Sequence, residues 1–150
     1  MSDVEVTARI DAPAKAVYDM VSDLPRMGEW SPENTGGRWV GGSGPIVGAT
    51  FRGTNRAGWR FWRTVVTVTD AAPGEKFAFN VHFAAVAISR WEYTFADSDG
   101  GCVVTESWTD RRPAWMRVGS IPVMGVKDRG AHNRRGMEKT LAALKVAAEA

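Results

Sequence analysis

Cysteine is nearly absent from this chain of 150 residues, and its scarcity excludes two kinds of structure. Cys102 is the only cysteine, so neither an intrachain disulfide nor a zinc site built from several cysteines can form. Its neighbours Val103 and Val104 favour a small buried apolar residue over a reactive thiol.

Long apolar runs are also missing. No segment approaches the ~20 consecutive apolar residues that cross a bilayer. The acidic opening, Met1-Ser2-Asp3-Val4-Glu5, leads straight into strand-like alternation and does not resemble a signal peptide. We therefore expect a cytoplasmic protein with no stable membrane insertion. We expect its oligomeric state to be a monomer or a homodimer.

The chain also has no large excess of positive or negative charge, since 19 Lys and Arg residues are balanced by 17 Asp and Glu. Proteins that bind nucleic acids carry a stronger basic stripe or a recognisable motif. The loose basic clusters here are interpreted as a solvated face, and no nucleic-acid partner is expected: Arg111, Arg112, Lys127, Arg129, Arg134 and Arg135.

Catalytic and metal-binding motifs are missing too. His82 alternates with inward-facing aromatics, so we expect it to point to solvent. Neither His82 nor His132 has a carboxylate or a second histidine at ligand spacing, so no metal site is predicted. No serine sits in a nucleophile elbow, and the glycine-rich stretch 41–44 lacks the Lys-Ser/Thr pair of a phosphate loop. We expect no cofactor.

Aromatic residues, in contrast, recur at every second position of Trp91-Glu92-Tyr93-Thr94-Phe95. Alternate side chains of a strand share one face, so these rings form a continuous apolar wall. Segments 62–68 and 77–83 repeat the pattern. The wall belongs either to a densely packed aromatic core or to the lining of a hydrophobic cavity.

Periodicity along the chain predicts an α+β order of one strand, short helices, about six strands and a long helix. The C-terminal helix has the only long apolar stripe and begins between Lys127 and Asn133. A curved antiparallel sheet wrapped around it, in one domain of residues 1–150, is the economical arrangement. The predicted elements are a strand at 4–10, a helix at 13–22, a short helix or turn at 23–30, short strands and turns at 36–48, and strands at 50–55, 60–70, 77–83, 88–95 and 102–108, with a hairpin turn at 56–58.

Several short segments, in their order and spacing, resemble the START-like or SRPBCC superfamily, particularly its polyketide cyclase/dehydrase branch. The matching segments are the opening strand and helix at 6–18, Trp30-Ser31-Pro32, the central strands at 72–79 and 91–95, and the final strand and helix at 103–106 and 137–145. The resemblance implies a helix-grip fold of six to seven strands with two short helices after the first strand. It also implies a cavity between the sheet and the C-terminal helix. Related proteins bind lipids, sterols, hormones or polyketides, and some catalyse cyclisation or dehydration.

If the rings of 91–95 point inward, the candidate pocket takes the inner faces of the strands and the apolar stripe of the last helix. A slip of one residue would reverse these faces. The candidate pocket residues are Trp30, Trp62, Thr64, Val66, Phe77, Phe79, Val81, Trp91, Tyr93, Phe95, Val104, Trp108, Trp115, Met137 and Leu141.

Glu106 shares the more apolar face of its strand with Cys102, Val104 and Trp108. A carboxyl group there would have a raised pKa and could act as a general acid or anchor a ligand. We favour the simpler interpretation, in which Glu106 lies at the wet end of the strand or pairs with an arginine. Likewise, Tyr93 could reach a ligand carbonyl, although a buried tyrosine more often bonds to backbone.

Trp30 and Trp115 lie in irregular segments, where they could form the mouth or lid of a cavity or could anchor loops against the core. Three functions remain open. The first is a protein that binds a hydrophobic or aromatic small molecule, such as a lipid or polyketide. The second is a cyclase or dehydratase that uses Glu106 as general acid or base. The third is a packed interaction module whose aromatics fill the interior.

Overall fold

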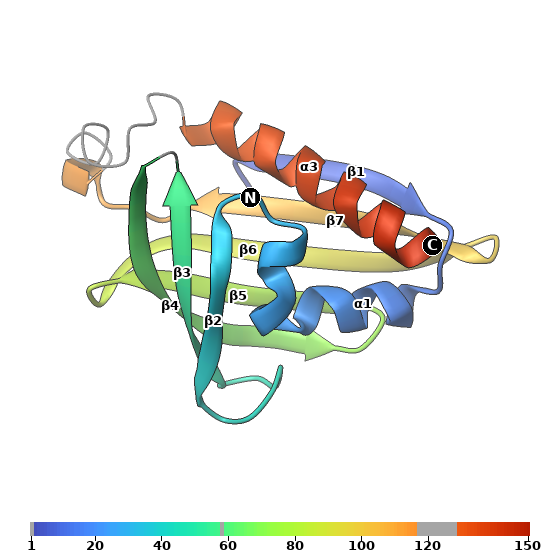
Figure 1. The fold of residues 1–150 in the computed structure, drawn as a ribbon, viewed down its shortest axis with the longest axis horizontal. Coiled ribbons are helices and arrows are strands. Elements are labelled where there is room, and N and C mark those ends of the chain that lie inside the picture. The colour runs from blue at the N-terminus through green and yellow to red at the C-terminus, as the bar shows by residue number, and fades with distance from the viewer. Residues whose placement is uncertain (1, 58, 117–128) are drawn as a thin grey trace.

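The computed structural model describes residues 2–57, 59–116 and 129–150. Its centre is a curved, seven-stranded sheet in the order β1-β7-β6-β5-β4-β3-β2, antiparallel throughout (Figure 1). The elements are β1 (Val4–Ile10), α1 (Ala14–Ser22), the 3-10 helix η1 (Leu24–Glu29), β2 (Asn34–Gly41), β3 (Thr50–Ala57), β4 (Arg60–Ala72), β5 (Lys76–Phe83), β6 (Val86–Ser98), β7 (Gly101–Asp110) and α3 (Arg129–Glu149). The predicted α+β fold is therefore confirmed, and α3 starts within its predicted range. The predicted hairpin turn includes Gly58, which lies outside the described residues.

The two longer helices lie on the same face of the sheet (Figure 1). α3 runs along β1 and β7, and α1 packs against β5, β6 and β7. Pro13 precedes the first turn of α1, and the apolar residues that follow at helical spacing are buried. On α3, Met137, Leu141 and Leu144 are buried, as their spacing predicts.

The predicted faces of the central strands are confirmed. On β7, Cys102, Val104, Glu106 and Trp108 are all buried, and each pairs across to β6 without a register shift. On β6, Tyr93 and Phe95 are buried on that same inner face. The inner face of β4 changes only after Val68, where a register shift against β5 displaces the rest of the strand.

The glycine-rich region forms β2 and the turn that follows it, in agreement with the predicted short strands. A Cβ atom on Gly37 would lie 2.2 Å from the Arg52 carbonyl oxygen and 2.7 Å from the Phe51 ring. Only glycine therefore lets β2 approach β3 this closely.

One half of the space between sheet and helices is solidly filled. Tyr18 of α1 makes edge-on contacts with Phe77 and Phe95, at ring-centre distances of 6.0 and 5.7 Å. Phe77 and Val104 are fully buried there. Since α1 reaches only this half, the rest of the inner face depends on α3 and the segment around η1 for cover (Figure 1).

Candidate functional site

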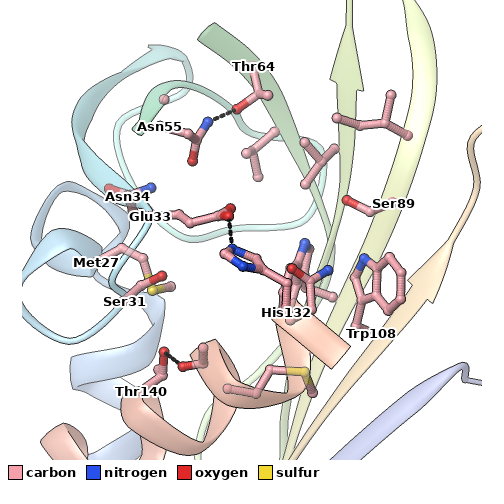
Figure 2. A pocket seen from close by; sticks show the side chains of 18 of the residues that line it. Met27, Ser31, Glu33, Asn34, Asn55, Thr64, Ser89, Trp108, His132 and Thr140 are labelled. Carbon is pink, nitrogen blue, oxygen red and sulfur yellow. Dashed lines mark hydrogen bonds and ion pairs between the residues drawn. The ribbon is translucent and has the colours of Figure 1, made fainter. Parts of the chain in front are cut away.

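A cavity of about 630 Å³ lies in the half that α1 does not fill. Its walls come from strands β3 to β7, from the first half of α3, and from residues between Met27 and Asn34. Figure 2 shows side chains from these elements turned toward a common space. The third hypothesis, an interior filled by aromatics, therefore describes only the half beneath α1.

The boundary between cavity and core crosses each central strand at the same level. Glu106 and Tyr93 line the cavity, whereas Val104 and Phe95, two residues along the same faces, do not. Val66 and Phe79 likewise line the cavity, whereas Val68 and Phe77 do not. The apolar residues of both levels belong to one hydrophobic cluster, so the cavity opens directly onto the core. Four residues therefore form the floor of the cavity: Val66, Phe79, Tyr93 and Glu106.

Most of the candidate pocket residues line this space, and Glu106 lines it with them. They are Trp62, Thr64, Val66, Phe79, Val81, Trp91, Tyr93, Trp108, Trp115 and Met137. Five others do not line the cavity, because they lie beneath α1, on the last turns of α3 or beside η1, where the interior is packed: Trp30, Phe77, Phe95, Val104 and Leu141.

The two tryptophans that the sequence places in irregular segments have different positions in the structure. Trp30 is buried at the end of η1, with the Arg26 guanidinium 5.1 Å from its ring centre, so it is a core anchor. Trp115 is 67% exposed and lines the cavity, which places it at the mouth.

Glu106 is the most unusual group of the site. Its side chain is buried, Oε2 accepts a 2.7 Å hydrogen bond from the Tyr93 hydroxyl, and Oε1 has no partner among the described residues. Burial raises the pKa of Glu106 to about 8, although the Tyr93 bond opposes that change. The favoured interpretation, a glutamate at the wet end or paired with an arginine, is therefore wrong.

Tyr93 completes this pair from the neighbouring strand. Burial and the adjacent Glu106 raise its pKa well above the usual value, so the hydroxyl stays protonated. Its partner is the carboxyl of Glu106 and not the backbone, which corrects the expectation drawn from the sequence. Because Glu106 is mainly protonated at neutral pH, it can donate its own proton to an acceptor in the cavity.

Aromatic rings make one wall of the cavity. Trp91 and Trp108 face each other across β6 and β7, with ring centres 6.5 Å apart and planes tilted by 46°. Trp108 also packs with Val4 and Met137 beneath α3. Such rings offer a flat, rigid and apolar surface to a ligand.

A second polar pair joins opposite sides of the cavity. His132 Nε2 on α3 lies 2.6 Å from Glu33 Oε1, in the segment just before β2 (Figure 2). Sequence reasoning found no carboxylate at ligand spacing from His132, because the two residues are 99 positions apart. The contact ties α3 to the segment that covers the cavity beside η1.

Further polar groups line the walls without having been predicted. Asn55 Nδ2 donates a 3.0 Å hydrogen bond to Thr64 Oγ1. Ser89 and Asn133 are buried, and within the described parts of the chain their side chains make no hydrogen bond. No pattern in the sequence singles out a serine inside a strand or an asparagine at a helix start, because both residue types are common there.

The described residues offer neither a metal site nor a membrane-spanning helix. They contain no group of three or more His, Cys, Asp or Glu side chains placed to hold a metal ion. None of the helices within them is long and apolar enough to span a membrane.

Comparison with known proteins gives a consistent picture. The sequence model of the family described as "Polyketide cyclase / dehydrase and lipid transport" matches residues 1–149. A polyketide cyclase-like protein from Corynebacterium glutamicum, solved by NMR, is 33% identical, with a TM-score of 0.64 over 95% of this chain and 88% of its own. A search of curated proteins found no relative.

More distant structures share the fold alone. The di-domain ARO/CYC of the steffimycin biosynthetic pathway is 18% identical, with a TM-score of 0.69 over 97% of this chain. This chain covers 44% of that protein. Major latex-like protein 151 from Panax ginseng is 10% identical, with a TM-score of 0.72 over 97% of this chain and 95% of its own.

Proposed function

Because this chain belongs to the polyketide cyclase/dehydrase and lipid transport family, we propose that its cavity binds a hydrophobic or aromatic small molecule such as a lipid or polyketide. One observation carries the proposal: a cavity of about 630 Å³ is lined by aromatic and apolar side chains, with Glu106 and Tyr93 at its floor. A volume of this size is typical of sites for small molecules, which usually occupy ~300–1,000 Å³.

The lining suggests how such a ligand would be held. Apolar walls such as the Trp91–Trp108 pair supply most of the binding energy, at ~25 cal/mol per Å² of apolar area removed from water. The protonated Glu106 donates to a carbonyl or similar oxygen at the floor, which satisfies its free oxygen and orients the ligand. The monomeric or homodimeric state and the cytoplasmic location stay predictions.

The proposal is tested by native mass spectrometry of freshly purified protein beside its denatured mass, followed by titration of the emptied protein with N-phenyl-1-naphthylamine. We expect a discrete extra mass, or saturable enhancement of the fluorescence of the probe together with a change in tryptophan emission. A protein that carries no extra mass and does not bind the probe would overturn the proposal.

A second function, cyclisation or dehydration of a poly-carbonyl chain, is favoured by the chemistry of Glu106. A carboxylic acid with a pKa of about 8 is suited to protonating a carbonyl oxygen as a new bond forms. The cavity would hold the chain in a folded conformation. If Glu106 performs this step, Glu106→Gln abolishes turnover of such a chain and leaves its binding largely intact. Full activity of the variant would refute the assignment.

A further inference from the structure

The charged residues around the cavity are unevenly distributed. Four of its described lining residues carry a positive charge, namely Arg56, Arg112, Arg135 and Lys139. Only two carry a carboxyl group, Glu33 and Glu106. Glu106 is mainly protonated at neutral pH because of its burial, so the lining has a clear excess of positive charge.

Some of the charged lining residues already pair with other side chains of the protein. The Arg112 guanidinium forms a two-pronged contact with the Asp110 carboxylate, at 2.9 and 2.8 Å. Glu33 contacts His132. Among the described residues, no acidic side chain pairs with Arg135 or Lys139, so their charges are available to a ligand.

Arg135 and Lys139 also lie on the same side of α3. Residues four apart lie on the same side of a helix, and both of these side chains are exposed while lining the cavity. By contrast, Asn133, Met137 and Thr140 of the same helix are buried. The two cations therefore mark the outer rim of the cavity on the α3 side.

The floor has the opposite character. None of its four residues, Val66, Phe79, Tyr93 and Glu106, carries a positive charge. An anion placed there would lose its hydration and face a buried carboxyl group. A negatively charged group on the ligand is therefore stable at the rim and unstable at the floor.

We propose that the cavity selects an amphipathic acid, an apolar or aromatic body that ends in a carboxylate, and binds it with the carboxylate beside Arg135 and Lys139. This inference rests on the proposed binding function and adds the class and orientation of the ligand. The body of the ligand lies between the tryptophan wall and β4. A neutral oxygen at its far end accepts a hydrogen bond from the protonated Glu106.

Two fluorescent probes that differ mainly by one anionic group test the inference. N-Phenyl-1-naphthylamine is neutral, and 8-anilinonaphthalene-1-sulfonate adds a sulfonate that stands in for the carboxylate. Both are titrated into the full chain, into the double variant Arg135→Gln/Lys139→Gln, and into Arg52→Gln/Arg63→Gln. The latter pair removes the same net charge from exposed positions that do not line the cavity.

We expect the rim variant to weaken sulfonate binding about fivefold and to change binding of the neutral probe by less than about twofold. The control variant should change neither probe by more than about twofold. Equal weakening of the sulfonate probe by both variants, or by neither, would overturn the inference. Failure of the wild-type protein to bind either probe would instead overturn the proposed binding function.

Discussion

The hydroxyl of Tyr93 lies 2.7 Å from Glu106 Oε2, between directly opposed residues of neighbouring strands. Both side chains point inward at the level where the packed core ends and the cavity begins. The carboxyl is thus fixed by Oε2, while Oε1 is buried and has no hydrogen-bond partner among the described residues. This arrangement positions a proton donor on a rigid sheet.

The raised pKa of Glu106 predicts how stability depends on pH. The folded protein holds a proton that the unfolded chain releases above its ordinary pKa of 4.5, and it keeps that proton up to about pH 8. The stability associated with this group is therefore complete below 4.5 and is lost as pH rises through 8. Between these two pH values the free energy of unfolding should fall by roughly 1 kcal/mol for each pH unit.

Urea unfolding of the wild type and Glu106→Gln across this range measures the effect. The variant cannot ionise, so its free energy of unfolding should exceed that of the wild type by an amount that grows with pH. Asp99→Asn, which replaces an exposed carboxyl in the β6–β7 turn, is the control and should show no such growth. A difference between wild type and Glu106→Gln that is the same at every pH would contradict the raised pKa.

Tyr93→Phe should move the ionisation of Glu106 to higher pH. The Tyr93 hydroxyl stabilises the ionised carboxylate, so its removal leaves desolvation unopposed. The loss of a buried hydrogen bond should also reduce the free energy of unfolding by about 1 kcal/mol. Carbon-13 NMR of the Glu106 carboxyl follows the titration directly.

Tyr18→Phe is the matched control, because that tyrosine is also buried but packs against Phe77 and Phe95 and not against Glu106. Its titration curve for Glu106 should coincide with that of the wild type. If Tyr93→Phe leaves the ionisation of Glu106 where it was, the hydrogen bond does not tune the carboxyl.

The boundary between core and cavity predicts different costs for two phenylalanines on one face of β5. Phe77→Ala opens a void in the packed half and should cost about 3–5 kcal/mol in free energy of unfolding. Phe79 already borders the cavity, so Phe79→Ala should cost only about 2 kcal/mol, mainly the lost transfer energy. Denaturant unfolding of both variants measures these losses in free energy of unfolding. Equal losses would show that the boundary between core and cavity does not lie between Phe77 and Phe79.

The contact between His132 and Glu33 should slow ligand release. It ties α3 to the segment before β2, so His132→Ala frees that side of the cavity. We expect stopped-flow release of N-phenyl-1-naphthylamine to become about three- to tenfold faster. His82→Ala, on β5 outside the cavity lining, should leave the rate unchanged. Identical rates of probe release from the wild type and His132→Ala would show that the contact between His132 and Glu33 does not slow ligand release.

The sequence predicted the strand faces well because β6 pairs with β7 without a register shift from Ser89 to Ser98. Alternation alone then places Tyr93 and Glu106 inside. It could not locate the floor of the cavity, since Phe77 and Phe79 have the same periodicity and only the packing of α1 separates them. The His132–Glu33 contact depends on tertiary approach, which a single sequence does not encode locally.

The central claim is that a ligand occupies this cavity, and a variant that fills the cavity tests it most directly. Ser89 is buried in the wall and its side chain makes no hydrogen bond within the described residues, so Ser89→Phe adds a ring to the space without removing a hydrogen bond. Thr94→Phe adds the same ring to the opposite face of β6. Calorimetric titration with N-phenyl-1-naphthylamine should show similar affinity for the wild type and Thr94→Phe, and at least about tenfold weaker binding to Ser89→Phe. Undiminished binding to a correctly folded Ser89→Phe protein would contradict the account.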